Sequence, residues 1–254
     1  MATKKTLIQS LDRAFDILAI VRDSPGSVRA TDIANQLSLG VATAHNLIRT
    51  LYSRGYLSQD ENNRYLLGPE CFKLCSAAGN NFDELRNVVA APVQNLANES
   101  GDTTFFGCEY YGTLYCVFIS TGGGQLVVSA KQDWLEKLHS TAAGKIIIAQ
   151  KGIDWYKKIC INNPPQKFTE KTITTLKSMT AEILKIKKNG YAVSDKECSD
   201  EVAAIGVAVY DKDHKLVGSL AQSFPSFYLE NGKIVLEDRI KLLNSYAEKI
   251  RNEL

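Results

Sequence analysis

The chain has no long hydrophobic run. No window of its 254 residues approaches the roughly 18 consecutive apolar residues that a membrane-spanning helix requires. The first segment, MATKKTLIQSLDR, also lacks the continuous apolar core of a secretory signal. We therefore expect a cytoplasmic protein with no membrane partner.

Neither sign of charge is in large excess, because 30 Lys and Arg residues stand against 28 Asp and Glu residues. Net charge therefore gives no argument for nucleic acid binding, which must rest on local features. The six cysteines are scattered through a chain large enough to fold without disulfides, which suits a reducing compartment. Cys71 and Cys75 have no further ligands at metal spacing, so we expect neither a metal site nor a cofactor.

Motifs for catalysis are also missing. The stretch HSTAAGKIII at 139–148 lacks the first glycine and the hydroxyl residue of a phosphate-binding loop, since His139 and Ile146 occupy those positions. The three histidines are too scattered for a catalytic triad, and no serine lies in a Gly-x-Ser-x-Gly turn. Asp195 and Glu197 fit a turn residue and a structural hydrogen-bond acceptor better than a hydrolase pair. We therefore expect no enzyme.

Three short helices and a hairpin are predicted at the N-terminus. Residues 10–22 place apolar side chains on one stripe, and 30–37 form a second helix with Thr31 as its cap. A third helix, 41–55, turns apolar residues inward, and 56–68 form a hairpin around a polar turn. The stripe of the first helix comprises Leu11, Ala14, Phe15, Leu18 and Val21, and the inward residues of the third are Ala44, Leu47, Ile48 and Leu51. This order is typical of a winged helix-turn-helix domain, 1–68.

The remaining two thirds of the chain read as a linker helix, 69–82, and an α+β domain, 83–254. Helices are expected at 83–100, 142–151, 172–189 and 236–253, and strands at 103–110, 113–120, 125–130, 203–211 and 215–223. Because the strands follow one another in hairpin-like pairs, we expect a largely antiparallel sheet flanked by helices.

The third helix presents a polar face opposite its apolar one. Small and hydrogen-bonding side chains fit the major groove of double-stranded DNA, where Asn pairs with adenine and Arg with guanine or phosphate. The alternative is a face that is merely solvated. Arg54, Arg64, Lys4 and Lys5 add phosphate candidates. The candidate DNA-binding residues are Thr43, His45, Asn46, Arg49, Thr50, Arg54 and Arg64.

Several motifs in order resemble the IclR family of bacterial transcriptional regulators. They are SLDRAFDIL, TDIANQLSLGVATAHNLIRTLYSRGYL, NRYLLG, LHSTAAGK, GYAVSDKE and AIGVAVYD followed by a strand ending in SFP. The resemblance implies a winged helix-turn-helix that binds operator DNA, a linker helix that helps to pair subunits, and a GAF-like C-terminal domain. It also implies a small effector, usually an organic acid, a homodimer or homotetramer, and no catalytic activity.

A helix that begins near Thr141 offers free amides to a carboxylate, and close packing against a sheet is the alternative reason for its small residues. The resemblance places an effector carboxylate against Ala142 and Ala143, and the far wall at Ser194, Ala204, Ala221 and Ser223. This chain departs from the family's pattern in the turn, where Ser38 replaces the usual Gly, and at Asn46, where a cation is common.

The sequence thus predicts a DNA-binding transcriptional regulator whose operator affinity is modulated by a small, acidic effector. Two alternatives remain open at this point. One is a ligand-independent DNA-binding or assembly protein, and the other is an enzyme that uses the C-terminal domain on small acids.

Overall fold

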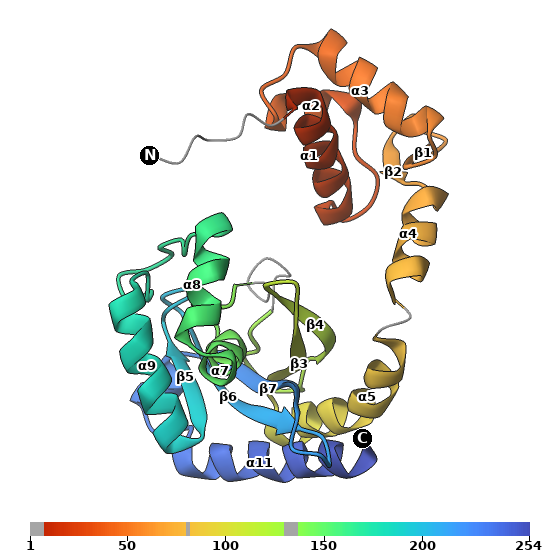
Figure 1. Ribbon diagram of the computed structural model, residues 1–254. Helices are drawn as coiled ribbons and strands as arrows, with labels where there is room; N and C mark the ends of the chain where they lie inside the picture. The colour runs from red at the N-terminus through yellow and green to blue at the C-terminus, as the bar shows by residue number, and fades with distance from the viewer. Residues whose placement is uncertain (1–7, 80–81, 130–136) are drawn as a thin grey trace. The chain divides into compact units, whose positions relative to one another are not determined.

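The computed structural model describes residues 8–79, 82–129 and 137–254 (Figure 1). The chain divides into two compact units, Met1–Asn81 and Phe82–Leu254. Each unit is built around buried hydrophobic residues of its own. Within the described ranges, no helix is both long enough and apolar enough to cross a membrane.

The first unit is a winged helix-turn-helix followed by one more helix. Its helices are α1 (Gln9–Asp23), α2 (Ala30–Gln36), α3 (Val41–Ser53) and α4 (Pro69–Gly79), and its strands are β1 (Leu57–Gln59) and β2 (Tyr65–Leu67). The two strands form an antiparallel hairpin, and Val28 adds a bridge to Tyr65. The predicted order of three helices and a hairpin is confirmed.

Two details of the first helices were predicted wrongly. On α1, Leu11 is 51% exposed and Phe15 60% exposed, whereas Ile17 and Val21 are buried. Ala14, Leu18 and Val21 of the predicted stripe do contact the core of the first unit, so the prediction was wrong for Leu11 and Phe15 and missed Ile17. Thr31 does not cap α2, since the helix begins at Ala30 and its N-cap residue, Arg29, makes no side-chain cap.

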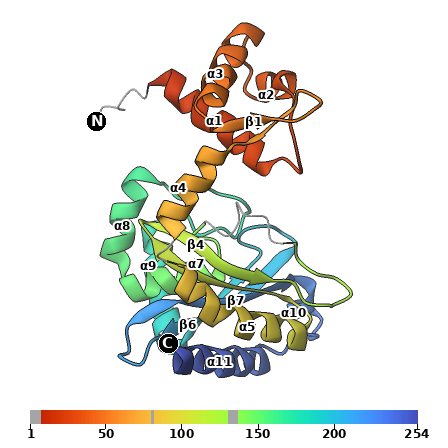
Figure 2. The same cartoon turned by 90° about the vertical axis from the view of Figure 1, so that its right-hand side faces the viewer.

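The second unit is a five-stranded antiparallel sheet with helices on both faces (Figure 2). The strands run in the order β4-β3-β7-β6-β5 across the sheet. Helices α5 and α11 cover one face, and α7 covers the other with α8 and α9 packed on it. The strands are β3 (Thr103–Tyr110), β4 (Thr113–Ser120), β5 (Tyr191–Asp195), β6 (Val202–Tyr210) and β7 (Leu216–Pro225). The helices are α5 (Asp83–Ser100), α7 (Ala142–Lys151), α8 (Ile153–Asn162), α9 (Leu176–Asn189), α10 (Phe227–Glu230) and α11 (Leu236–Glu253).

The two faces of the sheet differ in the size of their side chains. On β6, Ile205 and Val207 enter the core under α5 and α11, while Ala204 faces α7. A Cβ atom added to Gly206 would lie 3.1 Å from the carbonyl carbon of Ala142. Alternate residues of a strand point to opposite faces of the sheet. The small residues on the α7 side therefore let the start of α7 approach the sheet closely.

Other predicted boundaries need correction. Residues 125–129 form no strand, and Ala130 lies outside the described residues. Instead, the carbonyl of Val128 accepts a hydrogen bond from Thr103 Oγ1 at 2.6 Å. The helix expected at 172–189 begins at Leu176, because Thr175 caps it by accepting from Ser178 N at 3.1 Å. Elements α8, β5 and α10 were not predicted.

Candidate functional site

The outward face of α3 carries the predicted DNA-binding residues. Ala44, Ile48 and Leu51 are buried against the rest of the first unit. Leu47 also packs against this core, and the other positions of α3 are exposed, because residues three or four apart share one side of a helix. The exposed residues include Thr43, His45, Asn46, Arg49 and Thr50.

Hydrogen bonds within α3 orient two of these side chains. Arg49 Nη2 donates to Asn46 Oδ1 at 3.2 Å, so the guanidinium and the carboxamide form one unit on the surface. Thr50 Oγ1 donates to the backbone carbonyl of Asn46 at 2.8 Å. The carboxamide oxygen of Asn46 is thus occupied, which leaves its amide group as a donor.

A hollow of about 220 Å³ lies between α3 and the wing. Its lining adds two tyrosines, Tyr52 and Tyr65, to His45, Asn46 and Arg49. Sequence reasoning missed both tyrosines, although Tyr52 lies three positions after Arg49 on the same helix face. Tyrosine hydroxyls contact phosphate oxygens in many DNA complexes, which extends the candidate interface from α3 to β2.

Asp60 orders the turn of the wing. Its Oδ1 atom accepts from Asn62 N at 2.9 Å and from Arg64 N at 2.8 Å, and its Oδ2 atom accepts from Ser27 Oγ at 2.6 Å. The hydrogen bond from Ser27 lowers the pKa of Asp60, so the carboxylate stays charged. Arg64 is half-buried beside this turn.

Arg54 is exposed directly after α3. Lys4 and Lys5 lie outside the described residues.

The six predicted effector residues meet on the α7 side of the sheet. Ser194, Ala204 and Ser223 are register partners across β5, β6 and β7. Ala221 lies two positions before Ser223 on β7 and pairs with Gly206. Ala142 and Ala143 are fully buried at the start of α7, where Thr141 Oγ1 accepts from Gly144 N at 3.1 Å. The start of this helix therefore faces a row of small residues.

Hydrogen bonds to one carbonyl tie this row to the turn before α7. Ser194 Oγ donates to Ser140 O at 2.7 Å, and Cys198 Sγ donates to the same oxygen at 3.1 Å. Burial raises the pKa of Cys198, which keeps it a neutral thiol. The polar groups that remain beside the apolar floor are the Ser223 hydroxyl and the first amides of α7.

Lys145 is a structural residue. It is 1% exposed, and its Nζ atom bonds Glu182 Oε1 at 2.8 Å, Glu197 Oε1 at 2.6 Å and the carbonyl of Val193 at 2.6 Å. Asp195 pairs with Lys171. Asp195 and Glu197 thus each form an ion pair with a lysine.

Burial raises the pKa of Glu197, and Lys145 opposes this effect. The Oε2 atom of Glu197 is buried and has no hydrogen-bond partner among the described residues. In the described part of the chain, no group of three His, Cys, Asp or Glu residues is placed to hold a metal ion.

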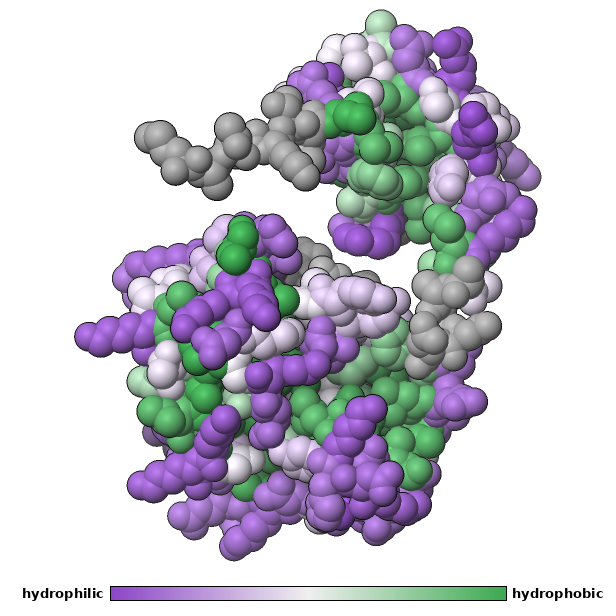
Figure 3. Space-filling view, in the orientation of Figure 1, coloured by the Kyte–Doolittle hydropathy of each residue, from purple (hydrophilic) through white to green (hydrophobic). Residues whose placement is uncertain are grey.

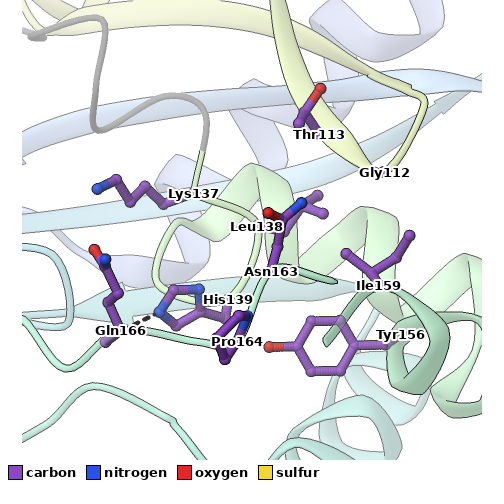
Figure 4. Close-up of a pocket in the computed structure, with 10 residues that line it drawn as sticks. All are labelled: Gly112, Thr113, Lys137, Leu138, His139, Tyr156, Ile159, Asn163, Pro164 and Gln166. Atoms are coloured by element: carbon purple, nitrogen blue, oxygen red, sulfur yellow. Dashed lines mark hydrogen bonds between the residues drawn. The ribbon is translucent and has the colours of Figure 1, made fainter. Parts of the chain in front are cut away.

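A cavity of about 340 Å³ lies beside the turn at 138–140 (Figure 4). None of the six predicted effector residues lines it. It is lined by Gly112, Thr113, Lys137, Leu138, His139, Tyr156, Ile159, Asn163, Pro164 and Gln166.

Family models match both units of the chain. The model of the IclR helix-turn-helix domain matches residues 10–61, and that of the bacterial transcriptional regulator IclR C-terminal domain matches residues 81–252. The chain belongs to the IclR family. It is therefore a DNA-binding transcriptional regulator with the effector-binding C-terminal domain of that family, and not an enzyme.

Individual relatives are distant but cover nearly the whole chain. The regulator XynR of Escherichia coli is 26% identical over 85% of this chain and 86% of its own length. The crystal structure of IclR from Thermotoga maritima aligns with a TM-score of 0.69 at 23% identity, over 98% of this chain and 99% of that one. An IclR homologue from Microbacterium hydrocarbonoxydans, solved with 4-hydroxybenzoate, aligns with a TM-score of 0.73 at 16% identity, over 96% and 98%.

Proposed function

We propose that this IclR-family regulator binds double-stranded operator DNA as a homodimer or homotetramer, and that a small carboxylate effector changes its operator affinity. The working parts would be the DNA-binding domain at 1–68, the linker at 69–82 and the effector domain at 83–254. The observation that carries the effector assignment is the start of α7 facing the row Ser194, Ala204 and Ser223.

The operator contact rests on the exposed polar face of α3. Asn46 and Arg49 are joined by a hydrogen bond and present donors that match base edges in a major groove. Thr43, His45 and Thr50 flank them, and Arg54 and Arg64 supply charge for phosphates. Because one copy of this domain carries little excess charge, specific binding calls for two copies on inverted half-sites.

Arg49→Ala tests the operator contact. We expect it to weaken operator binding by about tenfold or more, since one charge-assisted contact is lost, while the unfolding temperature stays unchanged. The operator is first recovered by enriching sheared genomic DNA on the purified protein, and affinity is then measured by fluorescence anisotropy. Lys177→Ala removes the same charge from an exposed position on α9 and is the matched control. Equal affinities of Arg49→Ala and wild type would exclude Arg49 from the interface.

The effector site rests on chemistry that favours a carboxylate. The first amides of α7 and the positive end of its dipole hold an anion without any charged side chain. The walls formed by Ala142, Ala143, Ala204 and Ala221 suit the apolar part of an organic acid. The 4-hydroxybenzoate bound by the Microbacterium homologue supports this ligand class.

Ser223→Leu tests the effector site, because Ser223 is a half-buried hydroxyl in the proposed wall. The operator affinity of wild type is measured in the presence of each of a panel of small organic acids. An acid that changes this affinity should lose its effect on the variant. If such an acid changes the operator affinity of Ser223→Leu as much as that of wild type, the effector binds elsewhere.

One observation favours a second candidate function, ligand-independent DNA binding. Ala142 and Gly206 are in close contact, and such packing by itself explains the small residues there. If no acid in the panel changes either operator affinity or the unfolding temperature, this second candidate replaces the first.

A further inference from the structure

We propose that the cavity beside α8 is a second ligand site, separate from the proposed effector site, and that it takes a small carboxylate with an apolar body. Its volume of about 340 Å³ lies within the range of small-molecule pockets. The ligand class follows from the shape of the walls, their charge and their hydrogen-bonding atoms.

Segments far apart in sequence form the walls. Gly112 comes from the β3–β4 turn and Thr113 from the start of β4. Helix α8 supplies Tyr156 and Ile159, and the chain after it supplies Asn163, Pro164 and Gln166. A Cβ atom on Gly112 would lie 2.7 Å from Ile159 Cδ1, and the φ angle of Gly112 is +84°. A glycine is thus required where the turn meets α8. Leu138, Ile159 and Pro164 supply the apolar surface.

Among the described residues that line the cavity, Lys137 is the only charged side chain, and none of them is a carboxylate. Its Nζ atom lies 4.5 Å from the centre of the Phe168 ring, and among the described residues no acid forms an ion pair with it. A carboxylate group of a ligand would therefore be its natural counter-ion.

The surroundings reinforce this charge. Between residues 151 and 190 there are nine lysines, at 151, 157, 158, 167, 171, 177, 185, 187 and 188, against three acids, at 154, 170 and 182. Each of the three acids already forms an ion pair with a lysine. In Figure 3, hydrophilic residues lie over α8 and α9 among apolar ones. A cavity in such a surface concentrates anions at its mouth.

Two buried groups supply directional hydrogen bonds. His139 Nε2 lies 2.8 Å from the carbonyl of Gln166, which accepts only, so Nε2 carries the hydrogen and Nδ1 is an acceptor in the neutral ring. Burial lowers the pKa of His139, which favours that neutral form. Burial also raises the pKa of Tyr156, so its hydroxyl remains a donor. Figure 4 shows this hydroxyl directed toward His139 and Pro164.

The turn at 138–140 separates the two sites. Leu138 and His139 line the cavity, whereas the next carbonyl, that of Ser140, accepts from Ser194 and Cys198 on the side of the proposed effector site. The cavity is therefore not an extension of the proposed effector site, and its occupancy is measurable on its own.

Histidine-selective labelling with ¹⁵N gives a readout inside the cavity, because the chain has three histidines, at 45, 139 and 214. The full-length protein is titrated with sodium benzoate at pH 7.5 and constant ionic strength. We expect the imidazole signals of His139, assigned with His139→Gln, to shift to saturation, while those of His45 and His214 stay in place. Neutral benzamide should bind at least about tenfold more weakly, because it lacks the charge that pairs with Lys137.

Two variants locate the binding. Lys137→Gln should weaken benzoate binding about tenfold, and Ile159→Trp should abolish the shift by filling the cavity, with circular dichroism confirming the fold of both. Lys212→Gln, at an exposed position in the turn between β6 and β7, is the charge-matched control and should bind as wild type does. The proposal is overturned if His139 does not shift, if benzamide binds as well as benzoate, or if Lys137→Gln and Lys212→Gln behave alike.

Discussion

At the scale of single residues, the buried Lys145 lies at the centre of a charged cluster in the second unit. A buried ammonium is stable only when its hydrogens are all accepted, and three oxygens do so here, those of Glu182, Glu197 and Val193. The second oxygen of Glu197 is buried, and no residue in the described ranges donates a hydrogen bond to it. This carboxylate is therefore the group in the cluster whose charge is least well compensated.

The stability of the second unit should depend on pH through Glu197. Burial raises its pKa above the ordinary 4.5, so the folded protein keeps this proton at pH values where the unfolded chain has lost it. The stabilisation is full below about pH 4.5 and is lost as the pH rises through the folded pKa. In urea unfolding, the stability of wild type relative to Glu197→Gln should fall across this range. A stability difference between wild type and Glu197→Gln that stays constant over this pH range would refute the assignment.

At the scale of elements, the turn between α2 and α3 carries local backbone strain. Ser38 has a φ angle of +51°, in the left-handed region that favours glycine. Ser38→Gly should relieve this strain and raise the free energy of unfolding of the first unit by about 1 kcal/mol, measured by chemical denaturation. Ser53→Gly, within α3, should lower it by a similar amount. No gain from Ser38→Gly would show that the serine is accommodated without strain.

The contact between α7 and the sheet is the second element-scale feature. A valine at position 206 would push against the backbone of Ala142 and Ala143, which lie 3.1 and 3.2 Å from the position of its Cβ atom. We expect Gly206→Val to destabilise the second unit by about 1 to 3 kcal/mol. The same variant should also reduce the response to an active acid in the operator assay, because the start of α7 moves. A fully stable variant with an unchanged response would contradict the close approach.

At the scale of the whole molecule, operator geometry should follow from paired DNA-binding domains. Inverted half-sites centred about one helical turn apart, roughly 10 base pairs, place both copies of α3 on one side of the DNA. Inserting about 5 base pairs between the half-sites should therefore weaken binding strongly in an anisotropy titration, whereas changing the sequence outside them should not. Equal affinity for a single half-site would argue against two-fold recognition.

Local patterns predicted most of the elements, and long-range contacts explain what was missed. The period of α3 correctly placed Ala44, Ile48 and Leu51 inside, because its whole length packs on one core. On α1, the same kind of pattern wrongly placed Phe15 inside, since periodicity groups residues on a face without showing what covers it.

The sites show the same limit. Family motifs indicated the residues around α7, and the structure brings all six together. Their roles in binding stay predictions. The cavity beside α8 has no sequence signal, because its lining is drawn from residues 112 to 166 and each segment looks ordinary by itself.

The unequal faces of the sheet have a consequence for how this chain can diverge. Toward α7, a Cβ atom at Gly206 would lie 3.1 Å from the backbone of Ala142, so we expect this position to exclude larger residues. Toward α5 and α11, large side chains such as Ile205 and Phe224 can exchange with others of equal volume but not with smaller ones. Homologous sequences should thus vary under opposite restraints at neighbouring positions of a single strand.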